Sequence, residues 1–239
     1  MLAIRGLTRR FGGITALNAL DLDVNAGEIF AMIGPNGSGK TTLFNVVTGV
    51  FPPHAGRLTF NGKDISRART HEIVRLGIGR TFQTIRLFTR LSVFQNAWLA
   101  LKATGDGVRA ERERVEELLR FTRLLDRQDE LAGNLNFGEQ RRLELARALA
   151  TQPSLLLLDE PAAGMTYAEV QDLIEDIQQL RATGKTIFLI EHVMDLVMGV
   201  ADRIAVLNFG EKLAEGTPAE IQSNPRVIEA YLGERAAHA

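Results

Sequence analysis

Short apolar runs separated by turn residues open the chain and predict β-structure. Strands are predicted at Leu2–Leu7, Leu20–Val24 and Ile29–Ile33, where Gly, Asn and Asp mark the turns. A hairpin is predicted over Gly56–Ile65, because Asn61-Gly62 at its centre is the dipeptide most typical of tight hairpin turns. The first third of the chain is therefore expected to be rich in strands.

Between about Leu91 and Ala150 the apolar positions follow a helical period. Ser92 and Gln95 form a capping box at the start of one predicted helix, and alternating charges predict a solvated helix after residue 107. Residues 135–149 (LNFGEQRRLELARAL) also have helical spacing, yet the segment begins with residues that suit a helix interior poorly. This bare helix start requires an explanation.

The last third alternates buried strands with helices. The runs SLLLLDE and KTIFLIEH predict fully buried parallel strands, and Thr166 with Glu169 forms a capping box for a helix that Gly184 ends. A strand pair is predicted over residues 203–216, followed by a short helix with Pro218 at its first position. The layout is an α/β core interrupted by a helical subdomain.

Composition restricts the possible classes of protein. The 239 residues are 45% hydrophobic and 24% charged, which suits one globular unit with its own core. A net charge of −1 gives no general attraction for nucleic acid, and the absence of cysteine excludes disulfides and thiol chemistry. The longest apolar region, residues 186–207, is interrupted by charges, and the N-terminus lacks a signal-peptide pattern. We expect a chain that is soluble by itself.

A glycine-rich loop predicts phosphate binding. GPNGSGKT at residues 34–41 follows a predicted strand and opens a helix near Lys40, as the pattern G-x-x-x-x-G-K-S/T requires. Backbone N–H groups of such a loop surround anionic oxygens, Lys40 can reach the β and γ phosphates, and the Thr41 hydroxyl can ligate Mg²⁺. The alternative is a glycine-rich turn with a surface lysine. The candidate binding residues are Gly34, Pro35, Asn36, Gly37, Ser38, Gly39, Lys40, Thr41 and Thr42.

Polar residues at the ends of later strands extend this site. Asp159 can hold a Mg²⁺ shell, and Glu160 can polarise an attacking water. Gln83 and His192 also stand at the ends of predicted strands, GIGRTFQ and TIFLIEH. Strand ends often carry such residues into solvent, but their order after a phosphate loop favours a functional interpretation.

Taken in order, these motifs resemble the ATP-binding subunit of ABC transporters over nearly the whole chain. The resemblance implies a single ABC ATPase domain over residues 1–239, with a P-loop NTPase core, an antiparallel β-subdomain and an inserted helical subdomain. The core with its β-subdomain would be residues 1–84 and 151–224, the helical subdomain 85–150 and a C-terminal tail 225–239. Matching motifs are the Walker A loop (34–41), the Q-loop Gln83, the signature (135–139), the Walker B end Asp159-Glu160 and the switch His192.

The resemblance also implies site roles. Catalysis would depend on Lys40, Glu160 and His192, with Mg²⁺ held by Thr41, Gln83 and Asp159. Phe11 occupies the family's adenine-stacking position, although it could instead pack within the β-subdomain. In the family, two subunits sandwich two ATP molecules head to tail, and each signature completes the partner's site. Residues acting in trans would be Asn136, Phe137, Gly138 and Glu139.

This arrangement would explain the bare helix start, which can present N–H groups to the partner's γ-phosphate. A plain N-capped helix, with Asn136 and Glu139 as a capping box, is the alternative, and both can hold. Asn136 stands where the family usually has serine, Glu139 where it has glutamine, Phe137 where glycine is frequent, and Thr166 where aspartate is frequent. These departures concern contacts across the dimer and leave the catalytic set intact.

Within the family, residues 79–100, 137–165 and 216–234 are similar to the ATPases of branched-chain amino-acid importers. Urea and lipopolysaccharide transporter ATPases share much of this similarity and remain alternatives. The resemblance implies membrane permease partners that dock near Thr84–Leu91, a second ATPase that is identical or paralogous, a substrate-capture protein, and a place on the inner face of the cell membrane. A soluble ABC protein is disfavoured by the single nucleotide unit, and a non-catalytic module by the intact catalytic set.

Overall fold

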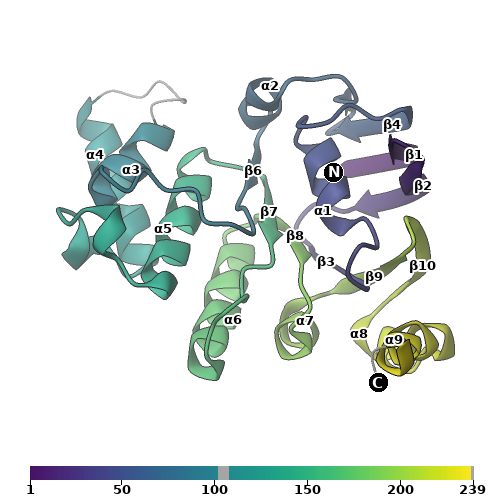
Figure 1. Cartoon of the computed structure of the whole chain (residues 1–239). Coiled ribbons are helices and arrows are strands. Elements are labelled where there is room, and N and C mark those ends of the chain that lie inside the picture. Colours follow the sequence, from purple (N-terminus) through teal and green to yellow (C-terminus); the bar gives the residue numbers. More distant parts are fainter. Residues whose placement is uncertain (102–107, 238–239) are drawn as a thin grey trace.

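Two β-sheets organise the protein, as Figure 1 shows for a computed structural model that describes residues 1–101 and 108–237. The smaller sheet is antiparallel and is ordered β2-β1-β4-β5. Its strands are β1 (Leu2–Phe11), β2 (Ile14–Val24), β4 (Ala55–Phe60) and β5 (Lys63–Asp64). This sheet is the predicted antiparallel β-subdomain.

The larger sheet has six strands in the order β10-β9-β3-β8-β7-β6 and is parallel except for the β9–β10 hairpin. Its strands are β3 (Ile29–Ile33), β6 (Ile78–Arg80), β7 (Leu155–Asp159), β8 (Thr186–Ile190), β9 (Arg203–Asn208) and β10 (Glu211–Gly216). Every residue of β3, β7 and β8 is buried, which explains why these strands are continuous apolar runs rather than alternating ones.

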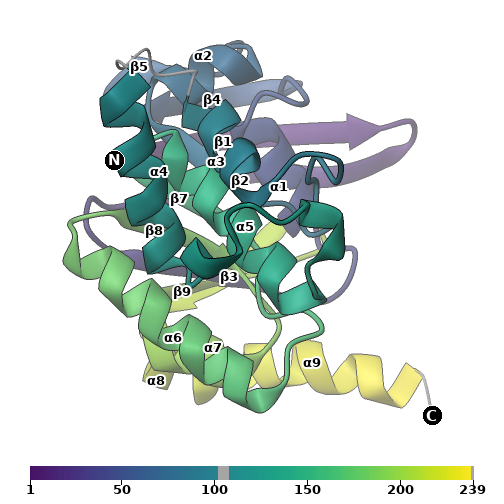
Figure 2. The same cartoon turned by 90° about the vertical axis from the view of Figure 1, so that its left-hand side faces the viewer.

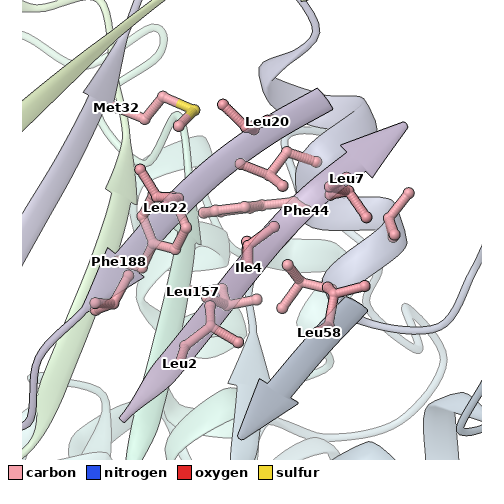
Figure 3. Close-up of a cluster of buried hydrophobic side chains, with 14 of the residues drawn as sticks. Leu2, Ile4, Leu7, Leu20, Leu22, Met32, Phe44, Leu58, Leu157 and Phe188 are labelled. Atoms are coloured by element: carbon pink, nitrogen blue, oxygen red, sulfur yellow. The ribbon is translucent and has the colours of Figure 1, made fainter. Parts of the chain in front are cut away.

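One face of the larger sheet packs against α1 (Lys40–Val47) and the antiparallel sheet. Figure 3 shows Phe44 of α1 within this cluster, and its ring contacts Phe188 of β8 edge to face at 4.9 Å. Leu7, Leu20 and the other side chains of the antiparallel sheet enclose it from the opposite side. The phosphate-loop helix is therefore held between two sheets.

Helices cover the other face of the larger sheet. They are α6 (Tyr167–Ala182), α7 (Met194–Val200), α8 (Pro218–Gln222) and α9 (Pro225–Ala237). On α6 the buried apolar residues recur at helical spacing, for example Val170, Leu173 and Ile177, and they join the cluster formed by β3, β7 and β8. These helices complete a layered α/β core.

The helical subdomain has its own hydrophobic cluster and lies to one side of the core, where α3, α4 and α5 gather in Figure 1. Its elements are α3 (Val93–Leu101), α4 (Val108–Phe121), α5 (Phe137–Ala150) and short 3₁₀ turns at Leu125–Arg127 and Ala132–Asn134. Helix α5 contacts both clusters, because Leu143 and Ala146 face the subdomain whereas Leu145 and Leu149 face the sheet. It joins the two parts of the molecule.

Several element boundaries differ from the sequence predictions. The β1–β2 hairpin extends to Phe11 and begins again at Ile14, so the predicted strands Leu2–Leu7 and Leu20–Val24 were too short. Polar residues at this end pair across the hairpin, for example Arg10 with Thr15, which local hydrophobicity does not reveal. Helices α2 (Thr70–Arg75) and α7 were not predicted, and the predicted tail is largely helix α9. The predicted helical residues 102–107 lie outside the described part.

Among the described residues, none of the helices has the length and apolar character needed to cross a membrane. This agrees with the interpretation of residues 186–207, which form a strand, a loop, a helix and part of a second strand rather than one span.

Removing the Phe44 ring is expected to destabilise the protein strongly. The substitution Phe44→Ala would leave a cavity between the two sheets and lower the free energy of unfolding by about 3–5 kcal/mol. Urea denaturation measures this change. The control Phe209→Ala removes a ring that is 86% exposed and should change it by less than about 0.5 kcal/mol. Equal effects of the two substitutions would contradict the placement of α1 in the core.

Candidate functional site

The phosphate loop lies between β3 and α1, wedged against two other strands. A Cβ atom at Gly34 would approach the Leu207 carbonyl oxygen to 2.1 Å, and one at Gly39 would approach the Ala16 carbonyl oxygen to 2.4 Å. Both glycines also have positive φ angles, 151° and 110°. Only glycine fits at these two positions, because a side chain would collide with the neighbouring strands. This close packing explains why the loop has glycine at both.

Lys40 is buried rather than exposed, which rejects the alternative of a surface lysine. Its ammonium donates to the carbonyl oxygens of Gly34 at 2.6 Å and Pro35 at 2.9 Å, so it is held over the loop. An open pocket of about 280 Å³ lies here. Its lining residues are Ala16, Asn36, Gly37, Gly39, Lys40, Thr41, Thr42, Gln83 and Glu160. Ser38, also predicted to bind, is buried in the loop.

Asp159, at the end of β7, forms a buried ion pair that the sequence analysis missed. The Arg80 guanidinium lies 2.8 Å from Asp159 Oδ2, and the two side chains are only 6% and 1% exposed. Burial raises the pKa of the Asp159 carboxyl, and Arg80 opposes this shift. Arg80 also donates to Asn45 of α1 and to Thr48, the residue that caps its C-terminus, so it joins β6, β7 and α1. An arginine inside the predicted strand GIGRTFQ was the available signal, since buried charges require partners.

The second Asp159 oxygen, Oδ1, is buried and has no hydrogen-bond partner among the described residues. Buried polar atoms are nearly always satisfied, so an orphan oxygen beside a phosphate loop fits a role toward a hydrated cation. The residues present therefore fit the Mg²⁺ that the family implies.

Three loops converge on the Glu160 carboxylate. Gln83 Nε2 donates to Glu160 Oε2 at 2.7 Å, and His192 Nδ1 lies 3.9 Å from the same oxygen. Glu160 adopts a left-handed backbone conformation with φ 48°, which costs of order 1 kcal/mol or more for a residue with a side chain. Thus residues 83, 160 and 192, which are far apart in sequence, come together, and two of them, Gln83 and Glu160, line the phosphate-loop pocket.

Phe11 lies in the β1–β2 hairpin and packs within the β-subdomain, as the alternative interpretation supposed. Its ring meets Phe51 edge to face at 5.3 Å, and the Arg9 guanidinium lies 4.7 Å from its centroid. The side chain stays 38% exposed, although it does not line the pocket. Stacking on adenine stays a prediction.

The start of α5 has the predicted capping box. Asn136 Oδ1 accepts from the Glu139 N–H at 2.9 Å, and Glu139 Oε2 accepts from the Asn136 N–H at 3.0 Å. Arg127 pairs with the other Glu139 oxygen at 2.9 Å. Although burial opposes it, these hydrogen bonds and Arg127 hold the pKa of the Glu139 carboxyl below its usual range. The charge of Glu139 is thus compensated within the chain.

Phe137 and Gly138 face the segment that follows Glu160. A Cβ atom at Gly138 would lie 2.8 Å from Glu169 Oε1, and one at Gly164 would lie 3.2 Å from the Phe137 ring. Thr166 forms its predicted capping box with Glu169. The signature is therefore adjacent to the loop between β7 and α6 of its own chain.

A groove of about 550 Å³ separates α2 from the helical subdomain, and the segment after Gln83 lines it. Arg86 lies over the Phe82 ring at 4.4 Å, and Arg147 over the Phe88 ring at 5.0 Å. The groove is thus lined by stacked aromatic and cationic side chains, at the place where a docking surface was predicted.

Residues 17–163 match the family model described as ABC transporter. The chain belongs to the ABC transporter family. Residues 211–237 match a second model, described as branched-chain amino acid ATP-binding cassette transporter. The high-affinity branched-chain amino acid transport ATP-binding protein LivG of Salmonella typhimurium is 44% identical over 250 residues, covering 98% of both chains. As an ATP-binding subunit of an ABC transporter, the chain is an ATPase whose hydrolysis of ATP is coupled to transport.

Solved ABC cassettes share the fold. The crystal structure of an ABC transporter cassette in its ADP conformation has a TM-score of 0.88 and 32% identity, covering 98% of both chains. A dimeric structure of a bacterial ABC transporter cassette has a TM-score of 0.83 and 26% identity, covering 91% of this chain and 99% of that one. These neighbours confirm the predicted ABC ATPase architecture, and one of them was solved in its ADP conformation.

Breaking the buried ion pair is expected to destabilise this ABC ATPase. The substitution Arg80→Met would leave the Asp159 charge buried and unpaired, lowering the free energy of unfolding by about 3–5 kcal/mol. Adding Asp159→Asn should restore part of this loss, as a double-mutant cycle in urea would show.

The matched control is Arg5→Met, because the Arg5–Asp23 pair has the same 2.8 Å separation but lies at the surface. Because solvent screens an exposed pair, its loss should lower the free energy of unfolding far less than the loss of the buried pair. If the two arginine substitutions had similar effects, the burial of the Arg80–Asp159 pair would not matter for stability.

Proposed function

We propose that the chain hydrolyses Mg·ATP within a head-to-tail dimer and so powers the uptake of branched-chain or other hydrophobic amino acids. Two observations carry the proposal. Gln83 and Glu160 line the phosphate-loop pocket, and the Gln83 amide and the His192 imidazole both approach Glu160 Oε2. The name of the similar LivG protein and the match of residues 211–237 support the substrate class.

Thr41 and Asp159 would hold the magnesium shell, together with Gln83. Mg²⁺ binds through one or two carboxylates and the phosphates of its nucleotide rather than through an all-protein cage. Within the described residues, no group of three His, Cys, Asp or Glu side chains could hold a metal ion. Bound Mg²⁺ would neutralise charge that develops on the β and γ phosphates.

Glu160 would orient the attacking water, and His192 would contact the γ-phosphate. In the present arrangement Gln83 donates to Glu160 Oε2, so Gln83 and the attacking water would share this carboxylate. Lys40, now bonded to two loop carbonyls, would turn to the phosphates. Phe11 would stack on adenine with its exposed edge or face.

The start of α5 would act across the dimer. The first N–H groups of a helix lack intrahelical acceptors, and the capping box satisfies those of Asn136 and Glu139. The N–H groups of Phe137 and Gly138 are therefore the ones offered to the partner's γ-phosphate. One of the similar cassettes is dimeric, which supports this pairing; the partner ATPase would be identical or paralogous.

Permease subunits would dock in the groove lined by Phe82, Arg86 and Phe88, to which the predicted docking segment Thr84–Leu91 contributes Arg86, Leu87 and Phe88. The chain would then lie peripherally on the inner face of the membrane, and a capture protein would deliver substrate to the permeases. Phe82 lines the groove, and the next residue, Gln83, lines the phosphate-loop pocket. Movement of the Q-loop would therefore alter the docking surface and the active site together.

Glu160→Gln should abolish turnover but preserve binding. Removal of the general base should lower the rate of phosphate release by about 10²–10⁴-fold. Because bound Mg·ATP is then not hydrolysed, a stable dimer should accumulate, and light scattering would measure it. The control Glu175→Gln changes an exposed carboxylate on α6 and should leave both measurements unchanged. Absence of activity in the unchanged chain, with no ATP-dependent dimer of Glu160→Gln beside its cognate partner, would refute the mechanism.

Uptake measurements in cells identify the class of substrate that is transported. Cells in which Glu160→Gln replaces the normal chain should lose the ATP-dependent uptake of labelled leucine, isoleucine and valine, because transport needs hydrolysis. Labelled urea serves as the comparison. Loss of urea uptake with normal leucine uptake would favour the alternative of a urea transporter.

A further inference from the structure

Glu191 is a fully buried carboxylate that the proposed mechanism does not use. It lies between the end of β8 and His192, and its residue is 0% exposed. Oε1 accepts from the Ala162 N–H at 2.8 Å, while Oε2 accepts from the N–H groups of His192 at 2.7 Å and Val193 at 2.9 Å. Burying a charge is costly unless it is hydrogen-bonded, so these three donors explain how it is tolerated.

The donors belong to two different loops of the site. Ala162 lies two residues after Glu160, and Val193 immediately follows His192. The Glu160 N–H in turn donates to the Ile190 carbonyl oxygen at 2.8 Å. The backbone around Glu160 is therefore tied to the end of β8 at two points, once directly and once through the Glu191 side chain.

We infer that Glu191 is a positioning residue for ATP hydrolysis, which sets the distance between the Glu160 carboxylate and the His192 imidazole. The inference rests on the proposed function. Glu191 is not among the residues that line the pocket. It would act on the pocket only through these two loops. His192 Nδ1 lies 3.6 Å from Glu191 Oε2 and 3.9 Å from Glu160 Oε2, so the imidazole sits between the two carboxylates.

The charge of Glu191 is needed because both of its oxygens accept. A glutamine at this position has nearly the same volume but only one acceptor oxygen, and its NH₂ group would face an N–H donor of one loop. One loop must then be released from the other. Displacements of about 1 Å can cost on the order of 100-fold in rate, even when the altered residue is remote from the reaction.

A role in packing alone makes the opposite prediction for two conservative variants. Glu191→Gln preserves volume but loses an acceptor, whereas Glu191→Asp preserves both acceptors but loses a methylene. If hydrogen-bonded positioning matters, Asp should retain the larger kcat; if packing matters, Gln should.

The experiment measures steady-state ATP hydrolysis by the full-length chain. For Glu191→Gln, kcat should fall on the order of 10- to 100-fold while KM for ATP stays within about twofold, because ground-state binding is unaltered. The matched control is Asp202→Asn. Asp202 also accepts a backbone N–H, that of Ile29 at 2.8 Å, and pairs with Arg181, but at the opposite end of β3. The Asp202→Asn substitution should lower the free energy of unfolding without changing kcat.

Amide ¹H–¹⁵N spectra provide a readout besides activity and also show that the variants are folded. In Glu191→Gln the signals of Ala162, His192 and Val193 should shift, whereas those around Asp202 should not. An active unchanged chain in which Glu191→Gln keeps its kcat, matches Asp202→Asn, or exceeds Glu191→Asp would overturn the inference alone. A chain inactive in every form, with no ATP-dependent dimer of Glu160→Gln, would overturn the proposed function and this role together.

Discussion

The register of the parallel strands is the constraint on which the site depends. In the ladder β3–β8–β7, Met32 pairs with Ile190 and Ile190 pairs with Asp159, so these strands end at one level. Each strand then continues into a loop at the same edge of the sheet. The phosphate loop, the Glu160 loop and the His192 loop meet there because the backbone hydrogen bonds leave them no other place.

Buried charges then determine how those loops are held. Arg80 joins β6, β7 and α1 through Asp159, Asn45 and Thr48. Glu191 joins two loops through backbone N–H groups. Each of these groups would be costly if left buried without its partners, so an arrangement of the loops that breaks these contacts is disfavoured.

Helix α5 links the site to the docking groove. Arg141 donates to the carbonyl oxygens of Phe82 and Gln83, and Glu144 accepts from the Phe82 N–H, so the Q-loop backbone is attached to this helix. The same helix begins with the signature and packs on both hydrophobic clusters. A rotation of the helical subdomain would therefore move the signature, Gln83 and the groove together. Figure 1 shows α5 between α4 and the strands β6 and β7, and in the turned view of Figure 2 it lies near the centre.

Local sequence patterns determined those strands, helix starts and loops whose conformation depends on residues close together in the chain. Continuous apolar runs predicted β3, β7 and β8, and the glycine spacing predicted the phosphate loop and its helix. Capping boxes marked the starts of α3, α5 and α6. The order of the motifs carried the resemblance to the ATPases of ABC transporters, and the comparisons confirmed the family. Only the tertiary structure decided the extent of the β1–β2 hairpin, the partners of Arg80 and Glu191, and the packing of Phe11 on Phe51. These features depend on contacts between residues that are distant in sequence. Local propensity, periodicity and motif spacing describe neighbouring residues and so do not predict such contacts.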